Sequence, residues 1–95
     1  MLRRLEAQTA SLYTMATRSD EAARRADRAA AGLQRNAELA ERAYSLGEVN
    51  LADVIAARRI AVEARLAATL AKLDATEARY RLMLDAHELW PLDAD

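Results

Sequence analysis

The sequence lacks cysteine altogether and has very few of the residues that break helices or fill a large core. Its 95 residues include no Cys, no Phe, one Pro and two Gly, and aromatic residues make up only 4%. Without cysteine, disulfides, thiol catalysis and cysteine-ligated zinc or iron–sulfur sites are excluded. Because β-branched and aromatic residues are scarce and no stretch alternates with period two, we expect no β-sheet.

Charge of one sign is not in excess either. The 15 acidic and 14 basic residues give a formal net charge of -1, so no overall field draws the chain to nucleic acid or to an anionic membrane. Arg24, Arg25, Arg28 and Arg35 lie close together, but acidic residues are interleaved among them. We interpret this region as a solvated, ion-pairing surface and expect no nucleic-acid partner.

Long hydrophobic runs are also missing. The arginines near the amino terminus are not followed by the apolar stretch of a secretory signal, so none is predicted. No run approaches the ~20 apolar residues of a membrane-spanning helix. We therefore expect a soluble chain with no direct membrane insertion by this segment.

The residues that are abundant favour long helices. Hydrophobic residues make up 53% of the chain and charged residues 31%, and alanine, arginine, glutamate and leucine dominate. This composition is typical of long helices and coiled coils. The length allows one domain at most.

Two glycines and one proline divide the chain. Gly32 lies inside a strong helical pattern and is expected to be tolerated there. Gly47 has the setting of a left-handed C-cap, and Asn50 can cap a new helix whose first turn holds Asp53. Pro91 is expected to end that second helix. The sequence therefore predicts a single helical hairpin over residues 1–95: helix 2–46, turn 47–50, helix 51–89 and tail 90–95.

Heptad spacing predicts how the two helices pack. The fold class is all-α: a long antiparallel two-helix coiled-coil hairpin, with helices roughly 60 Å long at 1.5 Å per residue. The first helix carries two seven-residue series rich in small residues, which allow close packing: Leu2, Thr9, Ala16, Ala23, Ala30, Ala37 and Tyr44, and Leu5, Leu12, Ser19, Ala26, Leu33 and Ala40. On the second helix, the expected stripe facing the first comprises Leu51, Val54, Ile55, Val62, Leu66, Leu73, Tyr80, Leu84 and His87.

A two-helix rod buries too little apolar surface to offset the conformational entropy of ordering its residues. We therefore expect the hairpin to associate into a helical bundle or barrel. The candidates for these outer contacts are Tyr13, Met15, Leu39, Leu70, Leu82 and Met83.

Chemistry-bearing residues are few. A cluster near the carboxyl end invites comparison with a metal site: Asp85, His87, Glu88, Asp93 and Asp95. However, Pro91 stands where the H-E-x-x-H pattern requires its second His, so we expect no metal site and interpret His87 as a surface or interface residue. Trp90 is interpreted as a helix-end packing residue. The sequence offers no candidate catalytic group, because it has one His, no Cys and no glycine-rich loop. We therefore expect no enzyme and no cofactor.

The turn and its flanks resemble a known motif. Residues 43–59 read AYSLGEVNLADVIAARR, similar to the hairpin-tip signature of TolC-type outer membrane efflux proteins, approximately A-Y-x-x-G-E-x-s-l-x-d-l-l-x-A-x-x. The following AVEARL of residues 61–66 and the ending YRLMLDAHELWPLD of residues 80–93 are similar to the CzcC-like branch, which serves heavy-metal export. The first helix matches only in its heptads and length.

The resemblance implies a role in transport. In that family, two structural repeats supply strands to an outer-membrane barrel and long helices to a periplasmic tunnel, and three protomers close the channel. This chain corresponds to the helix pair of the second repeat; the signal peptide, lipid-facing strands and first repeat of the family are missing, so we expect a fragment that conducts nothing alone. The resemblance implies that the tip docks a periplasmic adaptor, which joins the channel to an inner-membrane pump of the resistance-nodulation-division type. Carried over by position, the adaptor-contacting tip comprises Leu46, Gly47, Glu48, Val49 and Asn50.

The sequence leaves two other interpretations open. The chain could be a self-standing coiled-coil scaffold or oligomerisation module with no transport role, in which Gly47 is only a helix cap and Glu48 a solvated charge. It could also be the helical hairpin of an adaptor, although the signature from Tyr44 to Asp53 argues against this. The isolated fragment is expected to self-associate as a dimer or another bundle, and the parent channel as a trimer. The exported ion or drug, the adaptor and the pump are not specified by the sequence.

Overall fold

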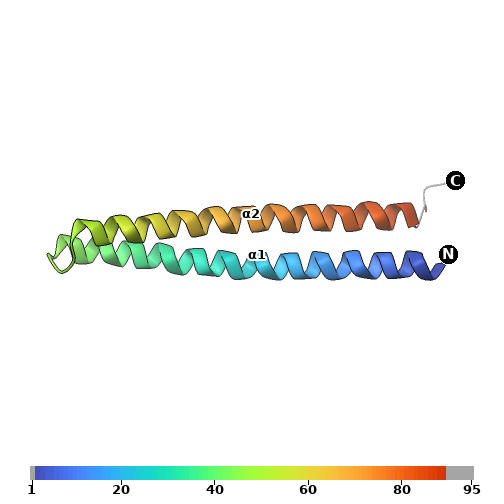
Figure 1. The fold of residues 1–95 in the computed structure, drawn as a ribbon, viewed down its shortest axis with the longest axis horizontal. Coiled ribbons are helices and arrows are strands. Elements are labelled where there is room, and N and C mark those ends of the chain that lie inside the picture. Colours follow the sequence, from blue (N-terminus) through green and yellow to red (C-terminus); the bar gives the residue numbers. More distant parts are fainter. Residues whose placement is uncertain (1, 90–95) are drawn as a thin grey trace.

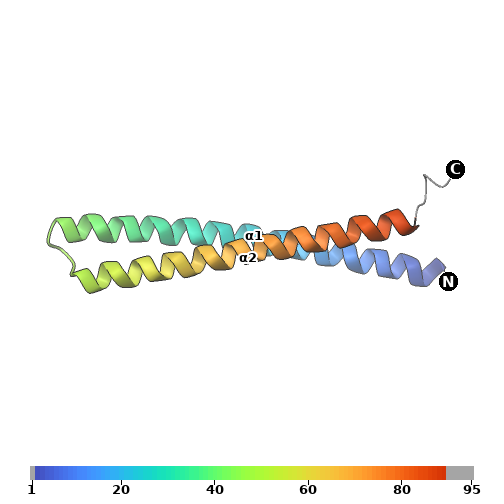
Figure 2. The same ribbon diagram turned by 90° about the horizontal axis from the view of Figure 1, so that it is seen from above.

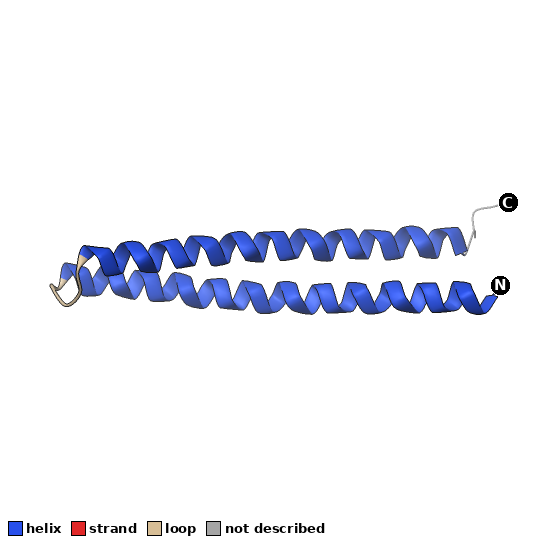
Figure 3. Ribbon diagram, viewed as in Figure 1, coloured by secondary structure: helices blue, strands red, loops and turns tan. Residues whose placement is uncertain are grey.

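The computed structural model describes residues 2–89, which form two long antiparallel α-helices joined by a short turn. Helix α1 spans Leu2–Ser45 and helix α2 spans Leu51–Leu89. The rod measures 71 × 24 × 14 Å, with the turn at one end and both chain ends at the other (Figure 1). No strand occurs among residues 2–89, and loop structure is confined to the turn (Figure 3). The predicted all-α helical hairpin is confirmed.

The helix boundaries lie close to their predicted positions. The sequence predicted Leu46 as the last residue of the first helix. Helix α1 instead ends at Ser45, and Leu46 belongs to the turn. It continues through Gly32, whose position is exposed and open, so the lost helix propensity does not interrupt it. Helix α2 has the expected bounds. The tail 90–95, with the interpretations placed on Trp90, Pro91, Asp93 and Asp95, lies outside the described residues.

The two helices wind around each other. They run side by side in Figure 1 and cross near the middle of the rod when viewed at 90° in Figure 2. A seven-residue repeat advances slightly less than two full turns of an α-helix, so a contact seam with this spacing makes the helices supercoil. The crossing therefore follows from the heptad spacing of the seam.

Alanine lines the seam along most of its length. The buried residues of the hairpin recur every seven residues on each helix: Ala23, Ala30 and Ala37 on α1, and Val54, Ala61, Ala68 and Ala75 on α2. The second series on α1 is half-buried from Leu12 through Ala40, as expected, whereas Leu5 at its start is exposed. Tyr44, at the end of the first series, is exposed as well. Small side chains at these levels let the two backbones approach closely. The seam predicted for the first helix is thus confirmed between Thr9 and Ala40.

The prediction for the second helix was wrong. Of its expected inward stripe, only Val54 is buried; Leu66 and Leu73 each expose 60% of their surface and Val62 exposes 69%. The remaining members are exposed as well: Leu51, Ile55, Tyr80, Leu84 and His87. The physical reason is steric, because a backbone separation set by alanines on α1 has no room for leucines on α2. From Ala61 to Ala75 the seam of α2 uses alanines instead, and most of the large residues of α2 face outward.

Most of the candidates for outer contacts are exposed. Tyr13, Met15, Leu39, Leu70 and Met83 expose between 49% and 64% of their surface. Leu82 is an exception, because it lies seven residues after Ala75 and is half-buried on the seam. The hairpin therefore leaves large apolar side chains exposed, chiefly on α2.

Ion pairs run along one edge of the seam. Three acidic residues of α1 reach three arginines of α2: Asp20 to Arg79 at 3.4 Å, Asp27 to Arg65 at 2.8 Å, and Glu41 to Arg58. We call these three pairs the charge ladder. The partner numbers on α2 fall as those on α1 rise, as the antiparallel arrangement requires. At the open end of the rod, Thr9 donates a hydrogen bond to Asp85 across the helices at 3.1 Å.

Candidate functional site at the hairpin tip

Backbone hydrogen bonds close the end of α1 in a Schellman motif. The Glu48 amide donates to the carbonyl of Ala43 at 2.8 Å, and the Gly47 amide donates to the carbonyl of Tyr44 at 3.0 Å. Gly47 has a φ of 76°, the left-handed conformation that this motif requires. Most residues with a Cβ are strained at this φ, so the turn itself favours glycine here. The predicted left-handed C-cap is confirmed.

The start of α2 is closed by side chains. Asn50 Oδ1 accepts a hydrogen bond from the Asp53 amide at 2.9 Å, and Asp53 Oδ2 accepts one from the Asn50 amide at 3.3 Å. This reciprocal arrangement is a capping box. Asn50 was expected to cap the helix and Asp53 to interact with its dipole. The return bond from the Asn50 amide was not predicted, although the spacing of three residues between the two side chains is its signal.

The structure brings the five predicted tip residues together at one end of the rod. Leu46 exposes 68% of its surface, Gly47, Glu48 and Asn50 are exposed, and Val49 is half-buried. The Asn50 side chain is committed to the cap, whereas Leu46 and Glu48 project from a backbone held on both sides. The tip therefore presents one large apolar side chain and one carboxylate next to a glycine.

Space around Gly47 is open. Apart from Gly47 and its two neighbours in the sequence, no atom of the chain would lie within 4 Å of a Cβ added at this position. The glycine is thus required by its backbone conformation and not by crowding from the rest of the hairpin. An external partner approaching the end of the rod would find the backbone of Gly47 unshielded by a side chain.

The rest of the rod offers little else for chemistry. Across residues 3–87, no polar or charged side chain is buried, and no group of three or more His, Cys, Asp or Glu side chains in the described part of the chain is placed to hold a metal ion. Asp85 is half-buried and His87 is exposed. Neither helix in the described part of the chain is long and apolar enough to cross a membrane.

Comparison with known proteins gives no relative for this chain. No family model matches it, and no curated protein or solved structure matches it.

Proposed function

We propose that this hairpin forms part of the periplasmic tunnel wall of a TolC-like outer membrane channel, in a tripartite efflux system of the resistance-nodulation-division type that exports heavy metals. The tip then docks the periplasmic adaptor protein through Leu46, Gly47, Glu48, Val49 and Asn50. The observation that carries this proposal is the tip itself: an exposed turn at the end of a 71 Å rod, fixed by a helix cap on each side.

A turn of this kind suits an end-on partner. The capping hydrogen bonds hold the backbone of Gly47 and Glu48 in one conformation before any partner arrives. Because a preorganised loop loses little conformational freedom on binding, more of the contact energy appears as affinity. The open space around Gly47 allows a partner's side chain to approach the backbone closely.

The shape of the rod suits a wall. Its alanine seam makes it thin, and large apolar side chains remain on the outside of α2. Neighbouring helices in a tunnel would cover these side chains, which the hairpin alone leaves in water. The resemblance of residues 43–59 to the TolC-type tip signature adds the identity of the assembly to this physical argument.

The test uses a full-length TolC-type channel that carries this hairpin, in cells with its adaptor and pump. Gly47→Asn is the informative variant, since Asn tolerates the left-handed conformation but places a side chain on the tip. We expect it to abolish adaptor co-purification and metal export while the channel is still produced. Gly32→Asn is the matched control, because Gly32 is equally open but lies inside α1, away from the tip.

Unchanged export and adaptor binding in Gly47→Asn would contradict the proposal. That result would favour a coiled-coil scaffold with no transport role. Gly47→Asp provides a second variant, in which a carboxylate next to Glu48 adds repulsion to the steric block.

A further inference from the structure

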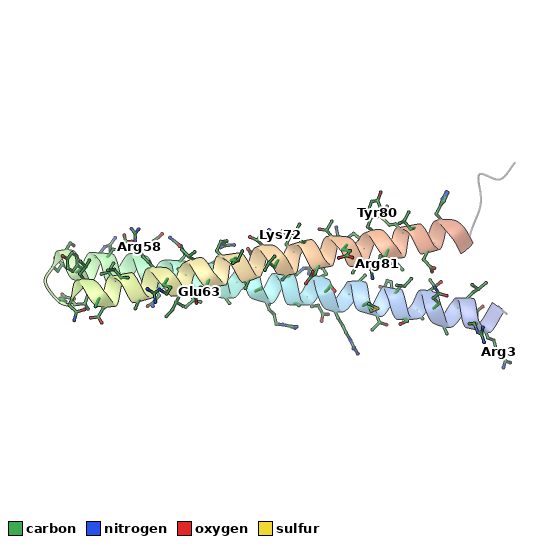
Figure 4. The ribbon with its side chains drawn as sticks, turned by 45° about the horizontal axis from the view of Figure 1, so that its top comes forward. Arg3, Arg58, Glu63, Lys72, Tyr80 and Arg81 are labelled. Carbon is green, nitrogen blue, oxygen red and sulfur yellow. The ribbon has the colours of Figure 1, made fainter. Side chains whose placement is uncertain are left out.

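The outward face of α2 carries a row of large apolar side chains that nothing in the hairpin covers. Its members expose between 51% and 69% of their surface: Ile55, Val62, Leu66, Leu70, Leu73 and Tyr80. We call this row the outer stripe. Tyr80 illustrates its direction, since its ring projects from α2 on the side away from α1 (Figure 4).

Two charged residues complete the outer stripe. Arg59 lies between Ile55 and Val62, and Glu77 lies between Leu73 and Tyr80, so that successive positions are three or four residues apart. This spacing keeps all eight side chains on one face of a helix with 3.6 residues per turn. Glu77 is paired with Arg81 in the hairpin at 2.8 Å, both side chains being largely exposed.

The outer stripe has the same order of apolar and charged positions in both directions from its midpoint between Leu66 and Leu70. Moving outward, Val62 corresponds to Leu73, Arg59 to Glu77, and Ile55 to Tyr80. Leu51 and Leu84 extend the correspondence by one more step, and both are about half exposed. Apolar positions thus match apolar positions, and the single charged pair has opposite signs.

We infer that the outer stripe is the interface of an antiparallel homodimer, in which the α2 helices of two copies pack against each other about a two-fold axis near Leu66 and Leu70. In a two-fold interface each contact occurs twice, so Arg59 of each copy faces Glu77 of the other. The midpoint lies near the middle of α2, and the two helices therefore overlap along most of their length. The α1 helices lie on the outside.

The available area agrees with a dimer. Six half-exposed side chains of this size present on the order of 450 Å² of apolar surface, which is within the range of about 300–600 Å² for the largest apolar patch on a typical monomer, a patch that is often functional. A standard interface buries about 800 Å² on each partner, of which about 65% is apolar in homodimers. The outer stripe, together with Leu51 and Leu84, supplies nearly the apolar share of such an interface.

A second α2 fits this surface better than the α1 helix of another copy. The outward face of α1 carries exposed charged residues, among them Glu21, Arg25, Arg28 and Arg35. Packing these residues against leucines would remove them from water without partners. A second copy offers two outward faces, one on each helix. Of these two, its outer stripe is the face that matches the outer stripe of the first copy in both polarity and charge.

The dimer leaves the hairpin tips free, because antiparallel packing places them at opposite ends. In a tunnel wall the outer stripe would be covered by neighbouring helices instead, so the dimer is the form of the unassembled chain. The inference does not depend on the proposed function. Gly47→Asn, which tests the tip, is expected to leave dimerisation unchanged.

Sedimentation equilibrium of the 95-residue chain tests the stoichiometry. We expect twice the 10.5 kDa mass of the chain at micromolar concentration, dissociating on dilution. Leu66→Glu is expected to weaken dimerisation at least ~100-fold, because it places a carboxylate at the centre of an apolar interface. Leu39→Glu is the matched control, since Leu39 on α1 exposes 62% of its surface and Leu66 exposes 60%. A monomer, a trimer or a dimer that tolerates Leu66→Glu would overturn the inference.

Charge reversal tests the pairing of Arg59 with Glu77. Arg59→Glu and Glu77→Arg are each expected to weaken the dimer roughly 10-fold, as like charges then face each other twice. The double variant restores the opposite-sign pairs and is expected to recover the original dissociation constant. Because both positions are exposed in the hairpin, circular dichroism should show unchanged helicity. Weakening that is not recovered in the double variant would contradict the pairing.

Single cysteines test the direction of packing, and the absence of other cysteines makes the result unambiguous. An oxidised mixture of Arg59→Cys and Glu77→Cys chains is expected to form the mixed disulfide in preference to either symmetric one. Within one helix the two positions are about 27 Å apart, so an antiparallel dimer keeps identical positions far from each other. Predominant symmetric crosslinks would show parallel packing and overturn the inference.

Discussion

Asn50 and Asp53 close the start of α2 by exchanging hydrogen bonds, each side chain accepting from the other's backbone amide at 2.9 and 3.3 Å. The Schellman motif on the other side of the turn satisfies carbonyls of α1. Backbone groups that two adjoining helix ends would otherwise leave to water are thus paired between Ala43 and Asp53. This pairing gives a solvent-exposed turn one defined conformation, on which any recognition of the tip depends.

Removing the cap is expected to destabilise the hairpin measurably. Asn50→Ala deletes the acceptor for the Asp53 amide and should lower the free energy of unfolding by about 1 kcal/mol. For a domain of this size, that corresponds to a fall in Tm of roughly 4–8 °C. Asn36→Ala is the control, since Asn36 is exposed within α1 and alanine favours the helix. All variants should be compared at one protein concentration because association raises apparent stability. An unchanged Tm for Asn50→Ala would mean that the cap contributes nothing.

The two glycines are expected to respond to alanine in opposite directions. Gly47→Ala forces a Cβ into the left-handed region at φ 76° and should destabilise the hairpin by about 1–2 kcal/mol. Gly32→Ala lies in open space within α1 and should stabilise it by up to about 1 kcal/mol. Thermal unfolding followed by circular dichroism measures both. Destabilisation of equal size at both positions would contradict the assignment of the left-handed cap to Gly47 alone.

The seam is expected to reject large side chains. Ala30 exposes 1% of its surface, and Ala68 on the facing helix exposes 2%. Ala30→Leu inserts three carbon atoms between closely packed backbones and should cost about 1–3 kcal/mol. Ala29→Leu, at the adjacent exposed position, should change stability by less than about 0.5 kcal/mol. Chemical denaturation compares the two. If Ala30→Leu were the more stable variant, the helices would be free to separate and the alanine seam would not fix their spacing.

The hairpin could be predicted from sequence because its determinants are local. Gly47 and Asn50 signal the turn directly, and the absence of other helix breakers leaves long helices on both sides. The seam of α1 followed from its seven-residue repeat. The facing side of α2 did not, because the largest apolar residues were assigned to the interface. Ala61, Ala68 and Ala75 follow the same seven-residue repeat and mark the side of α2 that packs against α1. This side can be identified only when the close backbone spacing imposed by α1 is taken into account.

The charge ladder could also have been found from spacing. Asp20, Asp27 and Glu41 occupy one heptad position of α1, and Arg58, Arg65 and Arg79 occupy one heptad position of α2. These series meet only if the helices are antiparallel and in one register, which is a property of the pair and not of either helix alone. A turn as short as residues 46–50 fixes both conditions, so the ladder follows from the turn.

The charge ladder is expected to favour the observed register of α1 against α2, while adding little to the free energy of unfolding of the hairpin. The Asp27 and Arg65 side chains are each 51% exposed, so their pair at 2.8 Å should contribute less than about 1 kcal/mol, and less still at high salt. A double-mutant cycle with Asp27→Ala and Arg65→Ala measures this coupling. Reversing all three acidic residues to Lys should have a larger effect, because it opposes like charges along the whole edge. Reversing Arg58, Arg65 and Arg79 to Glu in the same chain should then restore the original Tm. If the variant with all six substitutions were as unstable as the variant with the three Lys substitutions, the acidic residues of α1 would act through contacts other than these ion pairs.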